Sequence, residues 1–297
     1  MQIRPTTRIQ SIALLAAAAG MLTASTASAE LVYGVTAQQR LISFDTSTPG
    51  TIISGFAITG LASNEQISGI DLRPNDGFIY GLGSQNNLYR LNPSNGAATL
   101  VNPLGTALNG ASFGFDFNPT GPVALRIVSN TDKNYRLANP ATSGVVNTDT
   151  DLAYVAGDPN FGVNPNITHV AYSNNVPGAT STALFAIDAG LDALVRITTP
   201  NAGTLSTIGT LGMGGNANVN AIGGFDISGA SGLAFAAVQN VSLSQSTLWG
   251  IDLVTGAGTS LGTIGGGETL VAMTIVPSPA TASILALGVL ALGRRRR

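Results

Sequence analysis

The sequence predicts an all-β fold, a five-bladed β-propeller closed by pairing of its C-terminal strand with the first blade. Three observations carry this prediction: short apolar stretches that alternate with period two, turn glycines that return at similar intervals, and a first-strand pattern that the opening repeat lacks and the end of the domain supplies. Four strands in a repeat of about 40–50 residues are typical of a propeller blade. A β-sandwich is the alternative, which we disfavour because five matching four-strand units have no natural place in one.

The first strand of the repeat is the easiest to see, because a Gly-x-Asp core recurs in it. Three copies, at 69–72, 114–117 and 224–227, read Gly-Ile-Asp-Leu, Gly-Phe-Asp-Phe and Gly-Phe-Asp-Ile, and Val-Ala-Tyr-Ser-Asn at 170–174 is a degenerate fourth. A second apolar stretch follows each copy, as at 78–81. Short runs of this kind, bounded by Gly, Pro and Asn, predict strands.

The third and fourth strands of each repeat form a predicted hairpin. The third strand alternates with period two and ends in a residue that we expect to form an Asx turn, and these residues are Asp45, Asn92, Asp188 and Asp252. A turn with glycine then leads into the fourth strand. The turn glycines are Gly50, Gly96, Gly144, Gly203 and Gly256, with spacings of 46, 48, 59 and 53.

The two ends of the domain predict how the ring closes. The first repeat, Leu31–Leu61, has the second, third and fourth strands but no first strand. The last piece, Thr269–Val276, has the first-strand pattern and nothing after it. Pairing of these two pieces completes the fifth blade and removes exposed sheet edges, which would otherwise pair with other chains.

Residues 1–29 are predicted to be a secretory signal peptide. Arg4 and Arg8 precede an apolar run at 12–22, and small residues end in Ala27-Ser28-Ala29. A positive segment, an apolar segment and a small-residue cleavage site in this order are typical of export signals. We therefore expect residues 30–276 to form the secreted propeller domain.

Residues 277–297 are predicted to be a sorting or anchor segment. Pro277-Ser278-Pro279 breaks the fold, and 14 mostly apolar residues at 280–293 precede four arginines. A helix of 14 residues rises about 21 Å, which makes it a marginal transmembrane helix against a hydrocarbon core of about 30 Å. Its cationic end would lie on the cytoplasmic side.

This tail resembles the PEP-CTERM sorting signal, with Ser278 where that family usually has Glu. The resemblance implies a processing protease, an exosortase, that removes the tail, and delivery to the cell surface or extracellular matrix. A simple C-terminal membrane anchor is the alternative. Either way, contact with a membrane is expected only through this segment.

The domain resembles the domain-of-unknown-function 4394 family. The stretches that carry the resemblance follow in order along the chain, at 31–34, 69–74, 113–119, 126–129, 136–137, 164–166 and 171–174. The resemblance implies secreted β-repeat proteins, often with sorting tails and without an established activity. It brings no catalytic residues to this chain.

Composition excludes several classes of function. Charged residues are 9% of the chain, against about 25% in ordinary soluble domains. Residues 31–276 hold seven basic and 14 acidic side chains, too few scattered cations to bind nucleic acid. The absence of cysteine and the single histidine exclude disulfides, thiol catalysis and Cys/His zinc sites.

The first-strand aspartates Asp71, Asp116 and Asp226 are candidate ligand-binding residues. They occupy equivalent places in three blades, near the predicted central channel, where they could bind a cation or a sugar hydroxyl. Alternatively, each accepts backbone N–H groups from a neighbouring blade, because buried carboxylates need such partners and repeated residues usually serve the repeated architecture.

Blade three holds a second candidate site. Arg126, Lys133 and Arg136 lie within 11 residues, beside Asn134. Arginine binds carboxylates and phosphates bidentately, so Arg126, Arg136 and Asn134 are candidates for an anionic ligand or a uronic-type sugar. A structural salt bridge from Arg126 to Asp116 is the alternative.

Asp149, Asp151 and Asp158 form a candidate calcium site in the connection between blades three and four. Hard oxygen ligands suit Ca²⁺, although the EF-hand pattern is missing. Apart from calcium, no cofactor is expected.

Two functions remain open at this point. The first is an exported, non-enzymatic binding module for glycans or proteins, based on the two export signals and on a repeat scaffold without a catalytic constellation. The second is a secreted polysaccharide hydrolase or lyase that uses channel carboxylates as acid and base, which would require two carboxyl groups about 5–10 Å apart in an open funnel.

Overall fold

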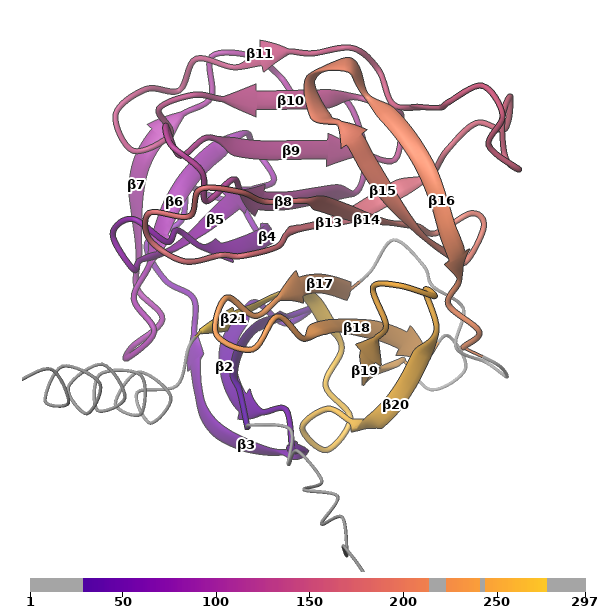
Figure 1. Cartoon of the computed structure of the whole chain (residues 1–297). Coiled ribbons are helices and arrows are strands. Elements are labelled where there is room, and N and C mark those ends of the chain that lie inside the picture. Colours follow the sequence, from indigo (N-terminus) through magenta and orange to yellow (C-terminus); the bar gives the residue numbers. More distant parts are fainter. Residues whose placement is uncertain (1–28, 214–222, 241–243, 277–297) are drawn as a thin grey trace, which may run out of the picture.

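The five predicted blades are present. The computed structural model describes residues 29–213, 223–240 and 244–276, and the predicted signal peptide and sorting tail lie outside these residues apart from Ala29. The described strands form five sheets, arranged around a common centre (Figure 1). We number the blades from the N-terminus, so that blade one contains β1 and blade five contains β20.

Each blade has its innermost strand at the centre and its outermost strand at the rim (Figure 1). The inner strands are β4 (Ile67–Leu72), β8 (Phe113–Phe117), β13 (Ile167–Tyr172), β17 (Gly223–Ile227) and β21 (Leu270–Val276). The second strands are β5 (Ile79–Gly83), β9 (Leu125–Ser129), β14 (Leu184–Asp188), β18 (Ala234–Asn240) and β1 (Leu31–Thr36). The third strands are β6 (Asn87–Leu91), β10 (Asn134–Leu137), β15 (Ala193–Thr199), β19 (Gln245–Ile251) and β2 (Arg40–Asp45). The outer strands are β7 (Ala98–Pro103), β11 (Asn147–Thr148), β16 (Thr204–Thr210), β20 (Gly258–Thr263) and β3 (Thr48–Ala57).

The predicted closure is confirmed. β21 pairs antiparallel with β1, with Leu31 opposite Val276 and Val35 opposite Ala272. The inner strands then follow one another around the ring, since β21 lies against β4 and β17, and β8 and β13 complete the circle. The last strand of the domain therefore lies in the first blade, and the ring has no open edge between blades five and two.

The predicted Asx turns are also confirmed. In all four, the side-chain oxygen accepts the backbone N–H two residues later: Asp45 from Ser47, Asn92 from Ser94, Asp188 from Gly190, and Asp252 from Val254. Gly96, Gly203 and Gly256 have positive φ and lie in the turn, as expected. Gly50 does not, because the blade-one hairpin turns on Thr46 and Ser47 alone and Gly50 falls inside β3.

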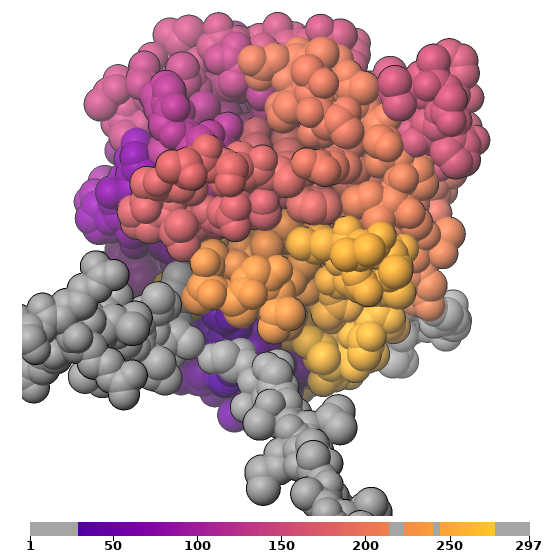
Figure 2. Space-filling view, viewed as in Figure 1, coloured from indigo at the N-terminus to yellow at the C-terminus, as the bar shows by residue number. Residues whose placement is uncertain are grey.

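Blade three departs from the repeat at its rim. Its outer strand β11 has two residues, and the chain then forms β12 (Ala153–Tyr154), which pairs in parallel with β16 of blade four. The connection after β12 projects from the body of the molecule (Figures 1 and 2). A one-turn 3-10 helix, η1 (Pro200–Ala202), joins β15 to β16. Among the described residues, no helix has the length and apolar character needed to cross a membrane.

The apolar core formed by the described residues is divided into five clusters, each between neighbouring blades. The cluster between blades five and one joins Phe235 and Leu248 to Val32 and Phe44. Met273 and Ile275 of the closing strand lie in the same cluster. Because each buried side chain of this size contributes about 1.5–3 kcal/mol, every junction between blades is stabilised by packing.

The glycine of the Gly-x-Asp pattern lets the inner strands approach one another. A Cβ at Gly69 would lie 2.8 Å from Phe115 Cβ, one at Gly114 2.9 Å from Val170 N, and one at Gly224 2.5 Å from Met273 N. Real Cβ atoms essentially never come this close to other heavy atoms. The pattern therefore marks the place where consecutive blades touch near the axis.

We expect Gly224→Ala to lower the free energy of unfolding by about 1–3 kcal/mol, because overpacking forces the β17 and β21 backbones apart. Gly250→Ala is the matched control in the same blade, since its Cβ would meet nothing closer than 3.9 Å, and it should change stability by less than about 0.5 kcal/mol. Urea denaturation measures both variants. Equal effects of the two substitutions would contradict the close approach.

Candidate functional site

The three first-strand aspartates converge at the centre of the ring. Asp71, Asp116 and Asp226 are each 1% exposed, and one carboxylate oxygen from each lies within 4.8 Å of the others. Among the described residues, this is the group of acidic side chains whose geometry could hold a metal ion. Its function depends on what these oxygens already bind.

Each of these carboxylates accepts a hydrogen bond from the backbone of the next blade. Asp71 Oδ2 accepts from Phe117 N at 2.8 Å, Asp116 Oδ1 from Tyr172 N at 3.0 Å, and Asp226 Oδ2 from Ile275 N at 2.6 Å. In every case the donor comes directly after the position equivalent to the aspartate. The aspartates thus link blade two to three, three to four, and five to one.

Thr274 takes the aspartate position in blade one and closes the links. Its hydroxyl oxygen accepts from Leu72 N at 3.0 Å. The same hydroxyl lies 3.0 Å from Asp71 Oδ1 and 3.1 Å from Asp226 Oδ2, and its single proton serves one of them at a time. Blade four has Ala171 at this position. The backbone of blade four donates to Asp116 of blade three, but Ala171 has no side-chain oxygen that could accept an N–H group of blade five.

A small cavity lies on the axis beside the aspartates. Two residues earlier on the inner strands, Gly69, Gly114, His169 and Gly224 line a cavity of about 20 Å³. A water molecule needs about 10–15 Å³ of such space. The carboxylates are therefore buried links between blades, and a polysaccharide cannot reach them in this conformation.

Burial and neighbouring acidic groups raise the pKa values of all three carboxyls. Burial is the largest cause for each, and it raises the pKa of Asp226 to about 7. The pKa of Asp71 is raised further by Asp226, and that of Asp116 by Asp71 and Asp226. Backbone N–H donors oppose these shifts without cancelling them.

We expect the free energy of unfolding to fall as pH rises from about 4 to 7. Above the ordinary pKa of 3.8 the unfolded chain releases protons that the native carboxyls still hold, so the native state binds more protons in this window. The stabilisation that comes from these retained protons is complete below the ordinary pKa of a carboxyl group. It is lost as the pH rises through the raised pKa of the native state. Urea denaturation at several pH values, with EDTA present to remove cations, measures the slope.

Asp116→Asn should flatten that slope, since the amide oxygen can still accept from Tyr172 N but carries no titrating proton. A stability that rises over the same pH range in the wild-type chain would contradict the buried, protonated cluster.

Arg126 breaks the repeat at the position opposite the aspartate. On the second strand, this position holds an aromatic side chain in the other four blades, Tyr33, Tyr80, Phe185 and Phe235, paired respectively with Thr274, Asp71, Ala171 and Asp226. In blade three, Arg126 pairs with Asp116. A guanidinium, 3% exposed, therefore replaces an aromatic ring at the junction of blades three and four.

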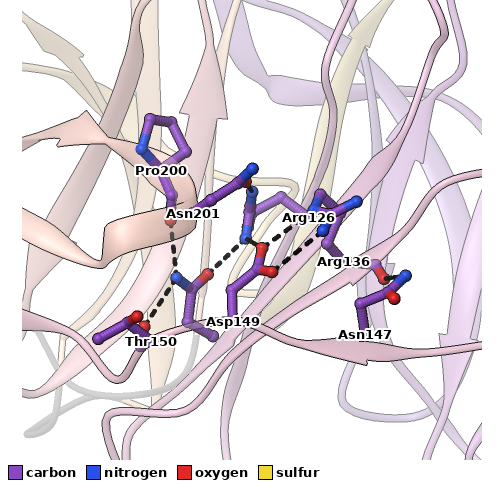
Figure 3. A network of polar contacts seen from close by, with 8 residues as sticks. Arg126, Arg136, Asn147, Asp149, Thr150, Pro200 and Asn201 are labelled. Carbon is purple, nitrogen blue, oxygen red and sulfur yellow. Dashed lines mark hydrogen bonds and ion pairs between the residues drawn. The ribbon is translucent and has the colours of Figure 1, made fainter.

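The ion pair that neutralises Arg126 is made with Asp149, not with Asp116. Arg126 Nη1 lies 2.7 Å from Asp149 Oδ2, and Arg136 binds the same carboxylate through Nε at 3.0 Å and Nη2 at 3.1 Å. Figure 3 shows Asp149 beside both arginines. Burial opposes ionisation, but hydrogen bonds from Arg136 and Arg126 hold the pKa of Asp149 below its ordinary value.

Two asparagines fix the position of the Arg126 guanidinium. Nη1 donates to Asn134 Oδ1 and Nη2 to Asn201 Oδ1, both at 2.7 Å. Asn134 is fully buried, and its amide nitrogen donates to the carbonyls of Thr150 and Pro200. Asn134 thus orients Arg126 rather than offering atoms to a ligand.

Arg126 keeps one hydrogen-bond donor without a partner. A guanidinium has five N–H groups, and Nη1 and Nη2 donate to Asn134, Asp149 and Asn201. The Tyr172 hydroxyl also hydrogen-bonds with the Arg126 side chain. Nε is buried and without a partner.

A pocket of about 420 Å³ lies against this network, between blades three and four. Its lining mixes two cations, amides, a hydroxyl and a phenol, and includes Asn118, Thr120, Arg126, Arg136, Tyr172 and Asn201. Pockets of about 300–1,000 Å³ are typical of small-ligand sites. Among the predicted candidates, the structure therefore brings Arg126 and Arg136 to one cavity, with Asn134 behind them.

The three aspartates of the candidate calcium site bind different partners. Asp149 is engaged by the two arginines, Asp151 forms an ion pair with Lys133, and Asp158 accepts from the N–H and hydroxyl of Thr207. The three carboxylates lie along the connection between blades three and four, and each of them fixes a different part of it through its own partner.

Asn201 is the contributor that inspection of the sequence missed. It lies in η1, in the blade-four hairpin, 75 residues after Arg126. Alignment of the five second strands shows that Arg126 occupies a position that is aromatic in the other four blades, and this is the sequence signal that points to the site. That alignment still would not have named Asn201, because the contact crosses between blades.

Comparison with known proteins assigns the chain to a family and supports the fold. A family model described as "Domain of unknown function (DUF4394)" matches residues 40–274. A search of curated proteins finds no match. A structural-genomics protein of unknown function from Bacteroides thetaiotaomicron has a TM-score of 0.50 at 14% identity, over 78% of this chain and 57% of that one.

A chain of a nidogen–laminin complex has a TM-score of 0.48 at 12% identity, over 84% of this chain and 98% of that one. A protein of unknown function from Bacteroides caccae has a TM-score of 0.41 at 8% identity, over 84% and 99%.

Proposed function

The chain belongs to the DUF4394 family, and from that premise we propose that it is an exported, non-enzymatic binding module that presents one face of its propeller to an extracellular glycan. The family description defines no activity, so the proposal depends on the geometry of the described residues.

The observation that carries the proposal is the engagement of the channel carboxylates. A glycosidase needs two carboxyl groups at a separation of about 5–10 Å that a substrate can reach. Asp71, Asp116 and Asp226 are instead 1% exposed and hydrogen-bonded to backbone N–H groups of neighbouring blades. Their burial supports a binding function over hydrolysis or lyase chemistry.

The lining of the pocket between blades three and four favours a glycan over a protein partner. Asn118, Thr120 and Asn201 offer amide and hydroxyl groups within a cavity of about 420 Å³. Such groups match sugar hydroxyls, whereas a stable protein interface requires about 1,000 Å² or more of complementary surface.

Export and surface display rest on the terminal segments, which lie outside the described residues. The predicted signal peptide at 1–29 supports secretion, and the tail at 277–297 supports a sorting protease as a transient partner. In this proposal the protein reaches the cell surface or extracellular matrix, and membrane contact is confined to the tail.

A glycan array with the secreted protein tests the function, with and without calcium. We expect a defined set of glycans to be retained intact, with equal binding in EDTA, because Asp149, Asp151 and Asp158 already have protein partners. Mass spectrometry of the washes detects any cleaved product. Product release would overturn the non-enzymatic function. Retention of protein probes alone would overturn the proposal that the ligand is a glycan.

A further inference from the structure

We propose that the pocket between blades three and four binds the carboxylate of an acidic sugar, a uronic acid, against Arg126 and Arg136. This inference rests on the proposed binding function, because it names the site and the ligand chemistry of the same module.

The break in the repeat is the first argument. Side chains that serve only the shared architecture recur from blade to blade, and at this position four blades use Tyr or Phe. An aromatic ring packs there without charge, whereas a buried guanidinium is unfavourable unless it is paired and hydrogen-bonded. The architecture that the blades share therefore does not require an arginine at this position.

The unpartnered Nε of Arg126 is the second argument. Asn134, Asn201 and Asp149 hold the guanidinium in one orientation through three bonds of 2.7 Å. Its Nε is left without an acceptor, and a charge-assisted hydrogen bond to a carboxylate oxygen would supply one. Arg136 binds the Asp149 carboxylate through Nε and Nη2, so the same chemistry is present next to the pocket.

The local charge selects a monoanion. Arg126, Arg136 and Asp149 together carry one net positive charge, and the neighbouring Lys133–Asp151 pair is neutral. The rest of the domain is acidic, with 14 acidic and seven basic residues between 31 and 276. One carboxylate neutralises the site, whereas a phosphate monoester brings close to two charges and leaves an excess.

The equivalent pocket between blades five and one shows what the scaffold provides without the arginine. It has a volume of about 320 Å³ and is lined by Leu233, Phe235, Ile251 and Leu261. Phe235 occupies the position that Arg126 has in blade three. Propeller geometry thus creates a pocket at both junctions. Only the pocket beside blade three has an arginine at this position, which makes it suitable for an anion.

The remaining polar lining fits the sugar ring that carries the carboxylate. Asn118, Thr120 and Asn201 lie in the same pocket as the arginines. They can exchange hydrogen bonds with ring hydroxyls, while Tyr172 supplies an aromatic wall. A carboxylate together with several hydroxyls is the chemistry of a uronic acid.

The test uses the full secreted chain, with an oligogalacturonate as probe and its methyl ester as the uncharged counterpart. Calorimetry should show binding of the acid, binding of the ester weaker by about tenfold or more, and a loss of affinity as salt rises. Arg136→Gln should weaken binding of the acid by a similar factor, since the site loses its net charge.

Arg126→Phe should abolish binding of the acid while the fold survives, because four other blades carry an aromatic at this position. Arg90→Gln is the matched control: Arg90 has the place in blade two that Arg136 has in blade three and stacks on Phe78. It should bind like the wild-type chain. Thermal melts identify any variant that fails to fold, and Arg136, at 30% exposure, should tolerate its substitution.

The outcomes separate this inference from the proposed function. Binding of acid and ester with equal affinity, or acid binding unchanged in Arg136→Gln, would overturn the carboxylate site and leave the glycan-binding module standing. Tighter binding of inorganic phosphate than of the acid would also overturn it. Failure to retain any glycan on the array would instead overturn the proposed function.

Discussion

The contact between inner strands at the axis is the constraint on which the rest of this structure depends. Five strands converge there, and their backbones approach so closely that Gly69, Gly114 and Gly224 have no room for a Cβ. Two residues after each of these glycines, an aspartate oxygen accepts a backbone N–H from the next blade, and Thr274 does the same in blade one. One short pattern thus supplies both the close approach and a polar link between blades, and it explains why Gly-x-Asp recurs.

This constraint also limits what the axis can do. Carboxylates that link the blades are buried and hydrogen-bonded, and burial and neighbouring acidic groups raise their pKa values, so these groups stabilise the ring. The repeat is broken in blade three: its outer strand is short, its connection to blade four crosses to the neighbouring sheet, and Arg126 replaces an aromatic residue beside a pocket. This is where we place the proposed ligand.

Particular residues show how far the sequence predicts this structure. The strand pairing of Leu31 with Val276 and the Asx turns at Asp45, Asn92, Asp188 and Asp252 were readable because each depends on a local pattern or on one missing strand. Gly50 was misplaced because a two-residue hairpin moved the turn. The convergence of the aspartates was predictable from their equivalent positions, but the choice between ligand and backbone as their partner was not.

The sequence by itself determined the number of blades and the closure, since period-two alternation and turn residues act over a few neighbouring positions. Tertiary structure decided the partner of Arg126. Asp116 faces it across the strand pair, yet the ion pair goes to Asp149 and the orienting amides come from Asn134 and Asn201. These groups belong to two blades and to the chain between them. Their meeting depends on how the ring brings one sheet against the next, and that geometry leaves no local trace in the sequence.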